Sequence, residues 1–215
     1  MQSRWNDADA RKFAEAAEAA GQPAALGLRV YSSRLIGQDP DLVLHGGGNT
    51  SVKIPDAPGK QIIHVKGSGW DLGDIEAPGL PAMWLEPLLE TRAIAHMSDE
   101  EMVAFLRRHL LDPTAPNPSV EALLHAYMPQ AFVDHSHATA ILALADQEDM
   151  EPVVREIYRG RVGFVPYVMP GYALSHACKD ALARDPKVEG LWLEKHGLFT
   201  FAISANDYFN RTVII

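Results

Sequence analysis

Residues 131–137 read AFVDHSH, and the interpretation of the whole chain starts from this stretch. The apolar residues that precede Asp134 predict a short buried strand, and on extended backbone two residues that are two positions apart point to the same side. His135 and His137 therefore direct their imidazole rings toward one point. Converging imidazoles are typical of a divalent-metal site, so residues 131–137 predict a strand that ends in a metal-binding pair.

His196 is the third candidate ligand. It lies at the break between two apolar runs, 190–193 and 197–202, where a loop at the end of a strand could return it to the histidine pair. Three histidines with one open coordination position are how a catalytic zinc site is built, because a closed set of four ligands leaves no room for substrate. The alternative is chance, since the chain contains 9 histidines and a pair two positions apart can arise without function.

Residues 116–125 (PNPSVEALLH) predict a helix with Asn117 as its N-cap and Pro118 at the first helical position. Glu121 then falls in the first turn, where the helix dipole stabilises a carboxylate, so the local sequence by itself indicates ordinary helix-start chemistry. His125 follows four residues later on the same helix face and could orient Glu121. A buried, hydrogen-bonded structural histidine is the preferred interpretation of His125.

Residues 45–53 (HGGGNTSVK) contain three consecutive glycines, which permit close approach of the backbone to a ligand. Asn49, Thr50, Ser51 and, further along, Ser68 offer neutral hydrogen-bond donors to an anion, which favours a sugar phosphate. A run of glycines is by itself more often a mobile turn, and this one matches neither of the common nucleotide-binding patterns. Nucleotide binding is therefore not supported by these residues.

Taken in order, these motifs resemble the class II aldolase/adducin family along residues 43–203. The forms HGGGNTSVK and VPYVMPG are most similar to the branch in which a rhamnulose-1-phosphate aldolase domain is fused to a downstream short-chain dehydrogenase. Residues 45–53 match the family's glycine-asparagine-x-serine loop, and residues 66–69 (KGSG) match its second phosphate loop. Residues 118–121 (PSVE) match the segment that carries the catalytic acid. The metal-ligand segments match at 135–137 and 195–198 (KHGL), and the stretch that connects them matches at 165–167 and 170–171.

The resemblance implies that His135, His137 and His196 bind zinc, or another divalent metal. It also implies that Glu121 is the general acid/base and can occupy the fourth metal position when substrate is absent. These roles fit the chemistry of retro-aldol cleavage, which needs a Lewis acid to hold the charge of an enediolate and a carboxylate to move a proton.

The resemblance further implies a set of substrate and phosphate contacts, namely Asn49, Thr50, Ser68, Gly69 and Ser119. One departure concerns the last of these, because Val120 stands where phosphate-binding members often have a second hydroxyl residue before the glutamate. Lys66 could replace that donor with a charge, although a solvated lysine at the end of a strand is the commoner case.

The expected function is that of a zinc-dependent aldolase that cleaves a ketose 1-phosphate, of the rhamnulose or fuculose type, to dihydroxyacetone phosphate and a hydroxyaldehyde. A pentulose-phosphate epimerase or a decarboxylase with the same metal chemistry is the first alternative, and a non-catalytic module like the adducin head is the second. Cleavage also needs a second acid, for which Tyr167 and Tyr172 are the nearest candidates. The resemblance implies a homo-oligomer, and tetramers occur in the family.

Length and composition are consistent with this interpretation. The chain has 215 residues, of which 47% are hydrophobic, enough for one domain spanning 1–215. A net charge of −9 argues against partners such as nucleic acid or an anionic membrane surface. With Cys178 as its one cysteine, no apolar leader and no apolar run of about 20 residues, the chain is expected in the cytoplasm.

Strands and helices alternate without a strict parallel rhythm, which predicts an α/β fold in which helices flank a mainly antiparallel central sheet. The resemblance implies the same three-layer α/β/α arrangement. We expect residues 70–87 to be mostly loop, and Ser98 and Glu101 form a capping-box pattern. The expected helices are 7–20, 23–36, 98–111, 137–145 and 171–183, and the expected strands are 51–54, 61–66, 190–193 and 197–202.

The C-terminal residues also carry a capping-box pattern, with Ser204 and Asp207 three positions apart. The helix that this pattern opens reaches residue 215 after barely two turns. We therefore expect the chain to be cut short at its C-terminus, with a dehydrogenase domain downstream in the full-length protein.

Overall fold

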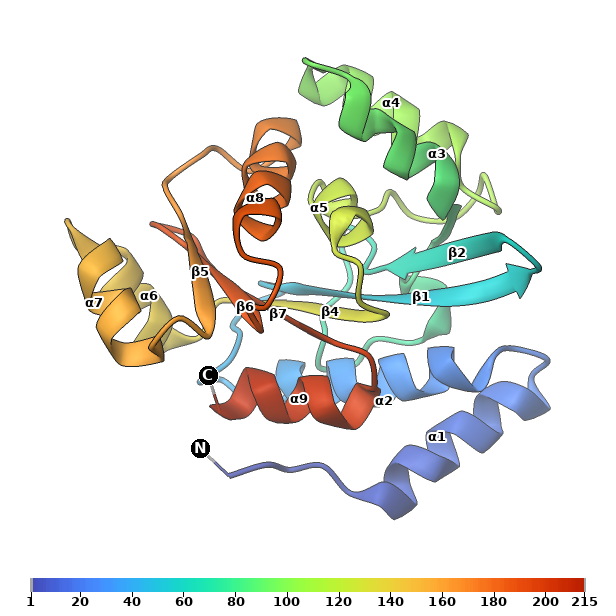
Figure 1. Ribbon diagram of the computed structural model, residues 1–215. Coiled ribbons are helices and arrows are strands. Elements are labelled where there is room, and N and C mark those ends of the chain that lie inside the picture. Colours follow the sequence, from blue (N-terminus) through green and yellow to red (C-terminus); the bar gives the residue numbers. More distant parts are fainter. Residues whose placement is uncertain (1, 215) are drawn as a thin grey trace.

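A seven-stranded sheet forms the centre of the computed structural model, which describes residues 2–214 (Figure 1). The strands lie in the order β3-β2-β1-β4-β7-β6-β5. Every neighbouring pair is antiparallel except β5 and β6, which are parallel. The strands are β1 (Asn49–Ala57), β2 (Lys60–Val65), β3 (Ala82–Trp84), β4 (Phe132–Ser136), β5 (Val162–Val165), β6 (Gly190–Leu193) and β7 (Gly197–Ala202).

Helices cover both faces of this sheet (Figure 1). On one face α2 and α9 lie against the strands, α1 packs on α2, and α6 and α7 share the same apolar core. On the other face lie α3, α4, α5 and α8, which bury two further apolar clusters. The α-helices are α1 (Asp7–Ala19), α2 (Ala24–Gly37), α3 (Leu85–Glu90), α4 (Asp99–Arg108), α5 (Ala122–Tyr127), α6 (Thr139–Ala145), α7 (Met150–Tyr158), α8 (Tyr172–Arg184) and α9 (Ala205–Ile214), and the short 3₁₀ turns are η1 (Ala77–Gly79) and η2 (Thr91–Ala93).

This architecture confirms the expected three-layer α/β fold with a mainly antiparallel sheet. The two N-terminal helices and the strands β2, β6 and β7 agree closely with their predicted ranges, and β1 pairs with β2 as expected but extends beyond the predicted 51–54 at both ends. The Ser98 side chain accepts from the Glu101 backbone N–H while the Glu101 carboxylate accepts from Ser98, so the predicted capping box is present. In residues 2–214, no helix is both long enough and apolar enough to span a bilayer.

Two regions differ from the sequence prediction. Residues 70–87 were expected to be mostly loop, but they contain edge strand β3 and the start of α3, because Ile63 and Met83 pair across β2 and β3 in a shared apolar cluster. Helix α7 and strand β5, between Met150 and Val165, were not predicted.

The predicted start of the Glu121 helix is also wrong. Helix α5 begins at Ala122, and Asn117 is not its N-cap. Residues 117–119 instead pair with residues 66–68: the Ser68 N–H donates to the Asn117 carbonyl at 2.7 Å, and the Ser119 N–H donates to the Lys66 carbonyl at 3.0 Å. The Asn117 side-chain oxygen accepts from Arg107. A tertiary backbone pairing therefore overrides the local helix-start signal.

Strand β4 lies in the middle of the sheet, and its side chains alternate between the two faces. Phe132 belongs to the apolar cluster on the α2 face, whereas Val133 belongs to the cluster beneath α5 and α8. Asp134 therefore faces α2 and His135 faces the α5 side. His135 pairs in register with Asn49 of β1.

A buried ion pair fixes β4 against α2. Arg29 Nη1 and Asp134 Oδ1 are 2.8 Å apart, and both side chains are 0% exposed. Arg29 also donates to the Ser51 carbonyl at 3.3 Å and to Ser33 Oγ at 3.1 Å. Burial raises the pKa of Asp134 to about 7, an effect that the neighbouring Arg29 opposes. One guanidinium thus ties α2 to two central strands.

The C-terminal end of α5 is held by a buried cation. Lys53 Nζ donates to the carbonyl of His125 at 2.8 Å and to that of Gln130 at 2.9 Å, while Arg92 donates to the carbonyl of Tyr127 at 2.6 Å. Cations at this end complement the helix dipole. Burial, aided by repulsion from Arg92, lowers the pKa of Lys53 to about 7.

Breaking the buried pair should destabilise the fold strongly. Arg29→Met leaves Asp134 buried without its cation, which costs about 3–5 kcal/mol of unfolding free energy in comparable cases. Urea denaturation followed by circular dichroism measures the change. The control is Arg155→Gln, because Arg155 pairs with Glu151 at the surface and such pairs contribute about 1 kcal/mol or less. An equal loss in both variants would contradict this role of Arg29.

Lys53 should make stability depend on pH. The folded chain releases the Lys53 proton above about pH 7, whereas the unfolded chain keeps it up to the ordinary value of 10.5. Unfolding therefore takes up a proton between pH 7 and pH 10.5. As a result, the contribution of Lys53 to the unfolding free energy rises with pH between these values and is lost as pH falls through 7. Urea titrations at pH 7 and pH 9 should show a weaker pH dependence for Lys53→Met than for the wild type, and equal slopes would refute the assignment.

Candidate metal centre and substrate cavity

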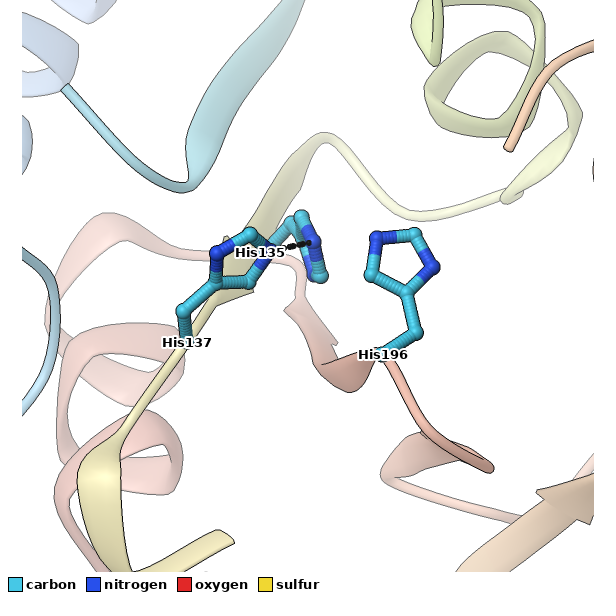
Figure 2. Close-up of side chains that lie close together, drawn as sticks. All are labelled: His135, His137 and His196. Atoms are coloured by element: carbon cyan, nitrogen blue, oxygen red, sulfur yellow. Dashed lines mark hydrogen bonds between the residues drawn. The ribbon is translucent and has the colours of Figure 1, made fainter. Parts of the chain in front are cut away.

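The structure brings His135, His137 and His196 together, and their rings surround one point (Figure 2). The first two rings extend from the end of β4 and the third from the tight turn between β6 and β7. One ring nitrogen of each lies within 4.8 Å of the others, and the Nε2 atoms of His135 and His137 are 2.8 Å apart. The convergence expected from the strand pattern and the break before residue 197 is therefore present.

The orientation of His135 is fixed from behind by β7. Its Nδ1–H donates to the carbonyl of Leu198 at 3.2 Å, which leaves the Nε2 lone pair directed at the other two histidines. Phe199 stacks on the imidazole with ring centroids 4.3 Å apart and an interplanar angle of 10°. Sequence analysis did not identify Phe199; its position opposite His135 depends on the register of β4 with β7.

Two glycines are required by the close approach of other backbones to this site. A side chain at Gly197, which has a φ of +155°, would come within 2.6 Å of the Ser136 carbonyl and 3.1 Å of the His135 ring. A side chain at Gly48, with a φ of +68°, would come within 2.6 Å of the His135 carbonyl. These glycines therefore allow the loops to lie directly against the histidine pair.

The three imidazoles suit a cation because they are neutral. Burial lowers the pKa of His135 well below its ordinary value, and neighbouring His137 lowers it further. Burial also lowers the pKa of His137, and it lowers that of His196 to about 4 with a further contribution from His135. Neutral imidazoles keep the lone pairs that a metal ligand needs. This donor set fits a divalent transition-metal ion such as zinc.

Glu121 lies beside the three histidines, immediately before α5. Its Oε1 is 3.3 Å from His196 Nε2, and its Oε2 is 3.8 Å from His135 Nε2. Asn49 Nδ2 donates to Oε2 at 2.6 Å, whereas Oε1 is buried without a hydrogen-bond partner. The carboxylate therefore presents one free oxygen to the candidate metal position, where it can bind a cation or hold a proton.

A cavity of about 420 Å³ opens in front of Glu121, His137 and His196. Four of the five residues expected to contact substrate line it: Asn49, Ser68, Gly69 and Ser119. The fifth, Thr50, is not brought to the cavity. It points to the opposite face of β1, where its fully buried hydroxyl lies 2.9 Å from Ser33 Oγ.

The pairing of residues 66–68 with 117–119 places Ser68 and Ser119 on the same wall of the cavity. Ser119 Oγ accepts from the Glu121 backbone N–H at 3.2 Å, so its own proton stays available to a ligand. Lys66 also lines the cavity; its side chain donates to the Gly46 carbonyl at 3.3 Å, and the residue is 7% exposed. Val120 is 48% exposed at the rim.

The two tyrosines suggested as a second acid lie outside this cavity. The Tyr172 hydroxyl is used within the fold, donating to the carbonyls of Thr91 and Ile94 at 2.7 Å. Tyr167 is half exposed, and its hydroxyl contacts Met169.

His125 is fully buried and hydrogen-bonded, in agreement with the preferred interpretation from sequence. Its Nε2 contacts Asn49 Oδ1, and its Nδ1 lies 2.8 Å from Ser51 Oγ. Burial, together with Lys53, lowers the pKa of His125 well below its ordinary value. The His125 side chain thus reaches the Glu121 carboxylate through Asn49, a contact that its spacing on the helix did not indicate.

A three-histidine cluster with an adjacent buried carboxylate, open to a polar cavity at one end of the central strands of an α/β sheet, defines a candidate divalent-metal domain. The chain belongs to the family described as Class II Aldolase and Adducin N-terminal domain, whose pattern matches residues 29–215. The resemblance found in the sequence is thereby confirmed at the level of the family, and the fusion branch stays a prediction.

Individual relatives agree with this family. Over 190 residues the chain is 37% identical to the protein named Uncharacterized oxidoreductase YuxG of Bacillus subtilis (strain 168), covering 86% of this chain but 28% of that protein. The N-terminal class II aldolase domain of a conserved Thermoplasma acidophilum protein is 37% identical, with a TM-score of 0.83 over 99% of this chain and 94% of that domain. L-fuculose-1-phosphate aldolase from Thermus thermophilus, at 17% identity, shares the fold with a TM-score of 0.54 over 87% of this chain and 89% of that one.

The site should bind about one divalent ion per chain. His135→Ala removes the central ligand and should abolish retention of zinc, measured by plasma mass spectrometry after zinc loading and desalting. The matched control is His96→Ala, because His96 is exposed and outside the cluster. Equal zinc contents in the two variants would show that the metal binds elsewhere.

Proposed function

We propose that this domain is a divalent-metal-dependent aldolase, with zinc as the ion, that cleaves a ketose 1-phosphate of the rhamnulose or fuculose type to dihydroxyacetone phosphate and a hydroxyaldehyde. The observation that carries the proposal is the buried Glu121 Oε1, without a hydrogen-bond partner, beside a cluster of three neutral histidines of which His137 and His196 line the cavity. The Thermoplasma acidophilum relative is named as a class II aldolase domain, and its similarity to this chain supports the same reaction class.

His135, His137 and His196 would hold the metal through the ring nitrogens that converge in Figure 2. When bound, the ion supplies Lewis-acid polarisation of a substrate oxygen, an effect that contributes several kcal/mol to such reactions. The protein's part is to keep the three rings neutral and in place. Leu198 and Phe199 do this for His135 through a hydrogen bond and ring stacking.

Glu121 would move the proton. When a carbon–carbon bond is cleaved in this way, the hydroxyl next to it loses a proton and the carbon of the released three-carbon fragment gains one. Glu121 lines the cavity, and its buried Oε1 has no hydrogen-bond partner and lies beside His196, so we assign Oε1 to hold and deliver that proton. Its Oε2 is held by Asn49, which keeps the carboxylate from turning away.

The anionic end of the substrate would lie against the wall formed by residues 66–69 and 117–119. Lys66 contributes a buried ammonium group whose hydrogen bond to Gly46 is long. Ser68, Gly69 and Ser119 supply hydroxyl and backbone groups around the same space. A phosphate would satisfy these donors and compensate the charge of Lys66.

The described residues that line the cavity include no tyrosine, so the second acid would come from another subunit or from water. We therefore propose that the working form is a homo-oligomer, for which a tetramer is the expected state. We also propose a full-length chain in which this domain is followed by a dehydrogenase, working in the cytoplasm. The match to 28% of the Bacillus subtilis protein is compatible with such a fusion.

Glu121→Gln tests the proton transfer. The variant should retain zinc and lose turnover by about a hundred- to ten-thousandfold, because the amide cannot exchange the proton. Rhamnulose 1-phosphate and fuculose 1-phosphate are incubated with each protein, and dihydroxyacetone phosphate is measured enzymatically. Glu151→Gln, which changes an exposed glutamate on α7, is the matched control.

Full cleavage by Glu121→Gln would remove Glu121 from the mechanism. Mass spectrometry of the wild-type reaction separates the alternatives, since an epimer or carbon dioxide in place of two fragments indicates the epimerase or the decarboxylase. Zinc binding without any conversion of the sugar phosphates would favour the non-catalytic module.

A further inference from the structure

Four buried polar side chains form a hydrogen-bonded series that leads from the interior of the fold to the carboxylate of Glu121. In order they are Ser51, His125, Asn49 and Glu121, and we refer to them as the Asn49 relay. Ser51 and His125 are 0% exposed, Glu121 5% and Asn49 7%. The relay joins β1 to α5, and the proposed reaction uses only its last two members, Asn49 and Glu121.

The chemistry of the groups determines where each proton lies. An ionised carboxylate only accepts hydrogen bonds, so the Asn49 atom 2.6 Å from Glu121 Oε2 must be its NH₂ group. The Asn49 carbonyl oxygen then faces His125 Nε2, which must carry a proton in order to donate. The opposite nitrogen, Nδ1, is left as an acceptor and receives the Ser51 hydroxyl proton across 2.8 Å. Each group therefore fixes the orientation of the next.

His125 is itself held on two sides. Lys53 donates to its backbone carbonyl at 2.8 Å, and Phe199 meets its ring edge-on with centroids 5.3 Å apart. The same Phe199 stacks on His135. His125 is thus a rigid donor behind Asn49, at a fixed place relative to the candidate metal ligands.

An asparagine amide can turn by half a rotation with almost no change in shape. In the turned state the Asn49 carbonyl oxygen would face the Glu121 carboxylate, so the two groups would repel each other and the carboxylate would lose its donor. The His125 N–H opposes this turn, because two donors, the His125 N–H and the Asn49 NH₂ group, would then face each other.

We propose that His125 is a positioning residue which, through Asn49, keeps Glu121 Oε2 hydrogen-bonded and thereby makes Oε1 the oxygen that transfers the proton. This inference rests on the proposed function for the role of Oε1. It also places the Asn49 amide between His125 and Glu121, with one N–H on Glu121 Oε2 and the carbonyl oxygen on His125. The second N–H of the same NH₂ group stays available to a ligand in the cavity that Asn49 lines.

The test compares His125→Leu, which removes the donor, with His125→Gln, whose side-chain NH₂ can replace Nε2–H. His64→Leu is the matched control, since His64 is also a buried histidine, bonded through Nδ1 to the Leu80 carbonyl on β2 and away from the cavity. Nuclear magnetic resonance of protein labelled with ¹⁵N in asparagine measures solvent exchange of the Asn49 side-chain NH₂, with Asn49→Leu to assign the signal. Steady-state cleavage and zinc content are measured on the same samples.

In the wild type the Asn49 NH₂ should exchange slowly, and in His125→Leu it should exchange about tenfold faster or more. The kcat of His125→Leu should fall by about 10- to 100-fold with little change in KM, and zinc should be retained. His125→Gln should recover most of both losses, and His64→Leu should match the wild type. If His125→Leu fails to fold, Ser51→Ala takes its place as a smaller change at the far end of the relay. It should shift the exchange rate and kcat in the same directions.

An unchanged Asn49 exchange rate in His125→Leu, or an equal loss in the leucine and glutamine variants, would overturn the proposal. A fall in kcat with Asn49 still protected would also overturn it, because the effect would then not pass through Asn49. If the wild type cleaves no sugar phosphate, the proposed function fails, whereas the exchange measurement still decides whether His125 orients Asn49.

Discussion

The ion pair between Arg29 and Asp134 is the constraint on which the site depends most. Both groups are fully buried, so any rearrangement that separates them leaves an uncompensated charge in the interior. A slip of β4 by one residue would turn Asp134 toward the cavity and His135 toward Arg29. The pair therefore sets which side chains of β4 face the candidate metal position, even though neither partner touches it.

Features that depend on neighbouring residues could be predicted from the sequence. The period of two along β4 is enough to place His135 and His137 on one face, and the break between two apolar runs is enough to place His196 in a turn. The Ser98 capping box is equally local, because its two residues bond to each other's backbone. The occurrence of several motifs in the correct order along the chain then sufficed to identify the family.

Features that depend on partners distant in sequence could not be predicted. Asn117 and Pro118 carry a strong local helix-start signal, but backbone pairing with residues 66–68 prevails over it. Thr50 lies one residue from Asn49, yet strand alternation sends it to the opposite face of the sheet. The contact of Phe199 with His135 requires the register of β4 with β7, which no spacing within either strand reveals.

The glycine loop and the histidine pair share one wall of the cavity. A side chain at Gly47 would come within 3.3 Å of His137 Nδ1, and one at Gly48 within 2.6 Å of the His135 carbonyl. Natural or laboratory evolution therefore has little freedom to change ligand preference through this loop, since a larger residue there would disturb the candidate metal ligands at the same time. Val120, by contrast, is 48% exposed at the rim of the cavity, so a change in the specificity proposed for this site is expected there first.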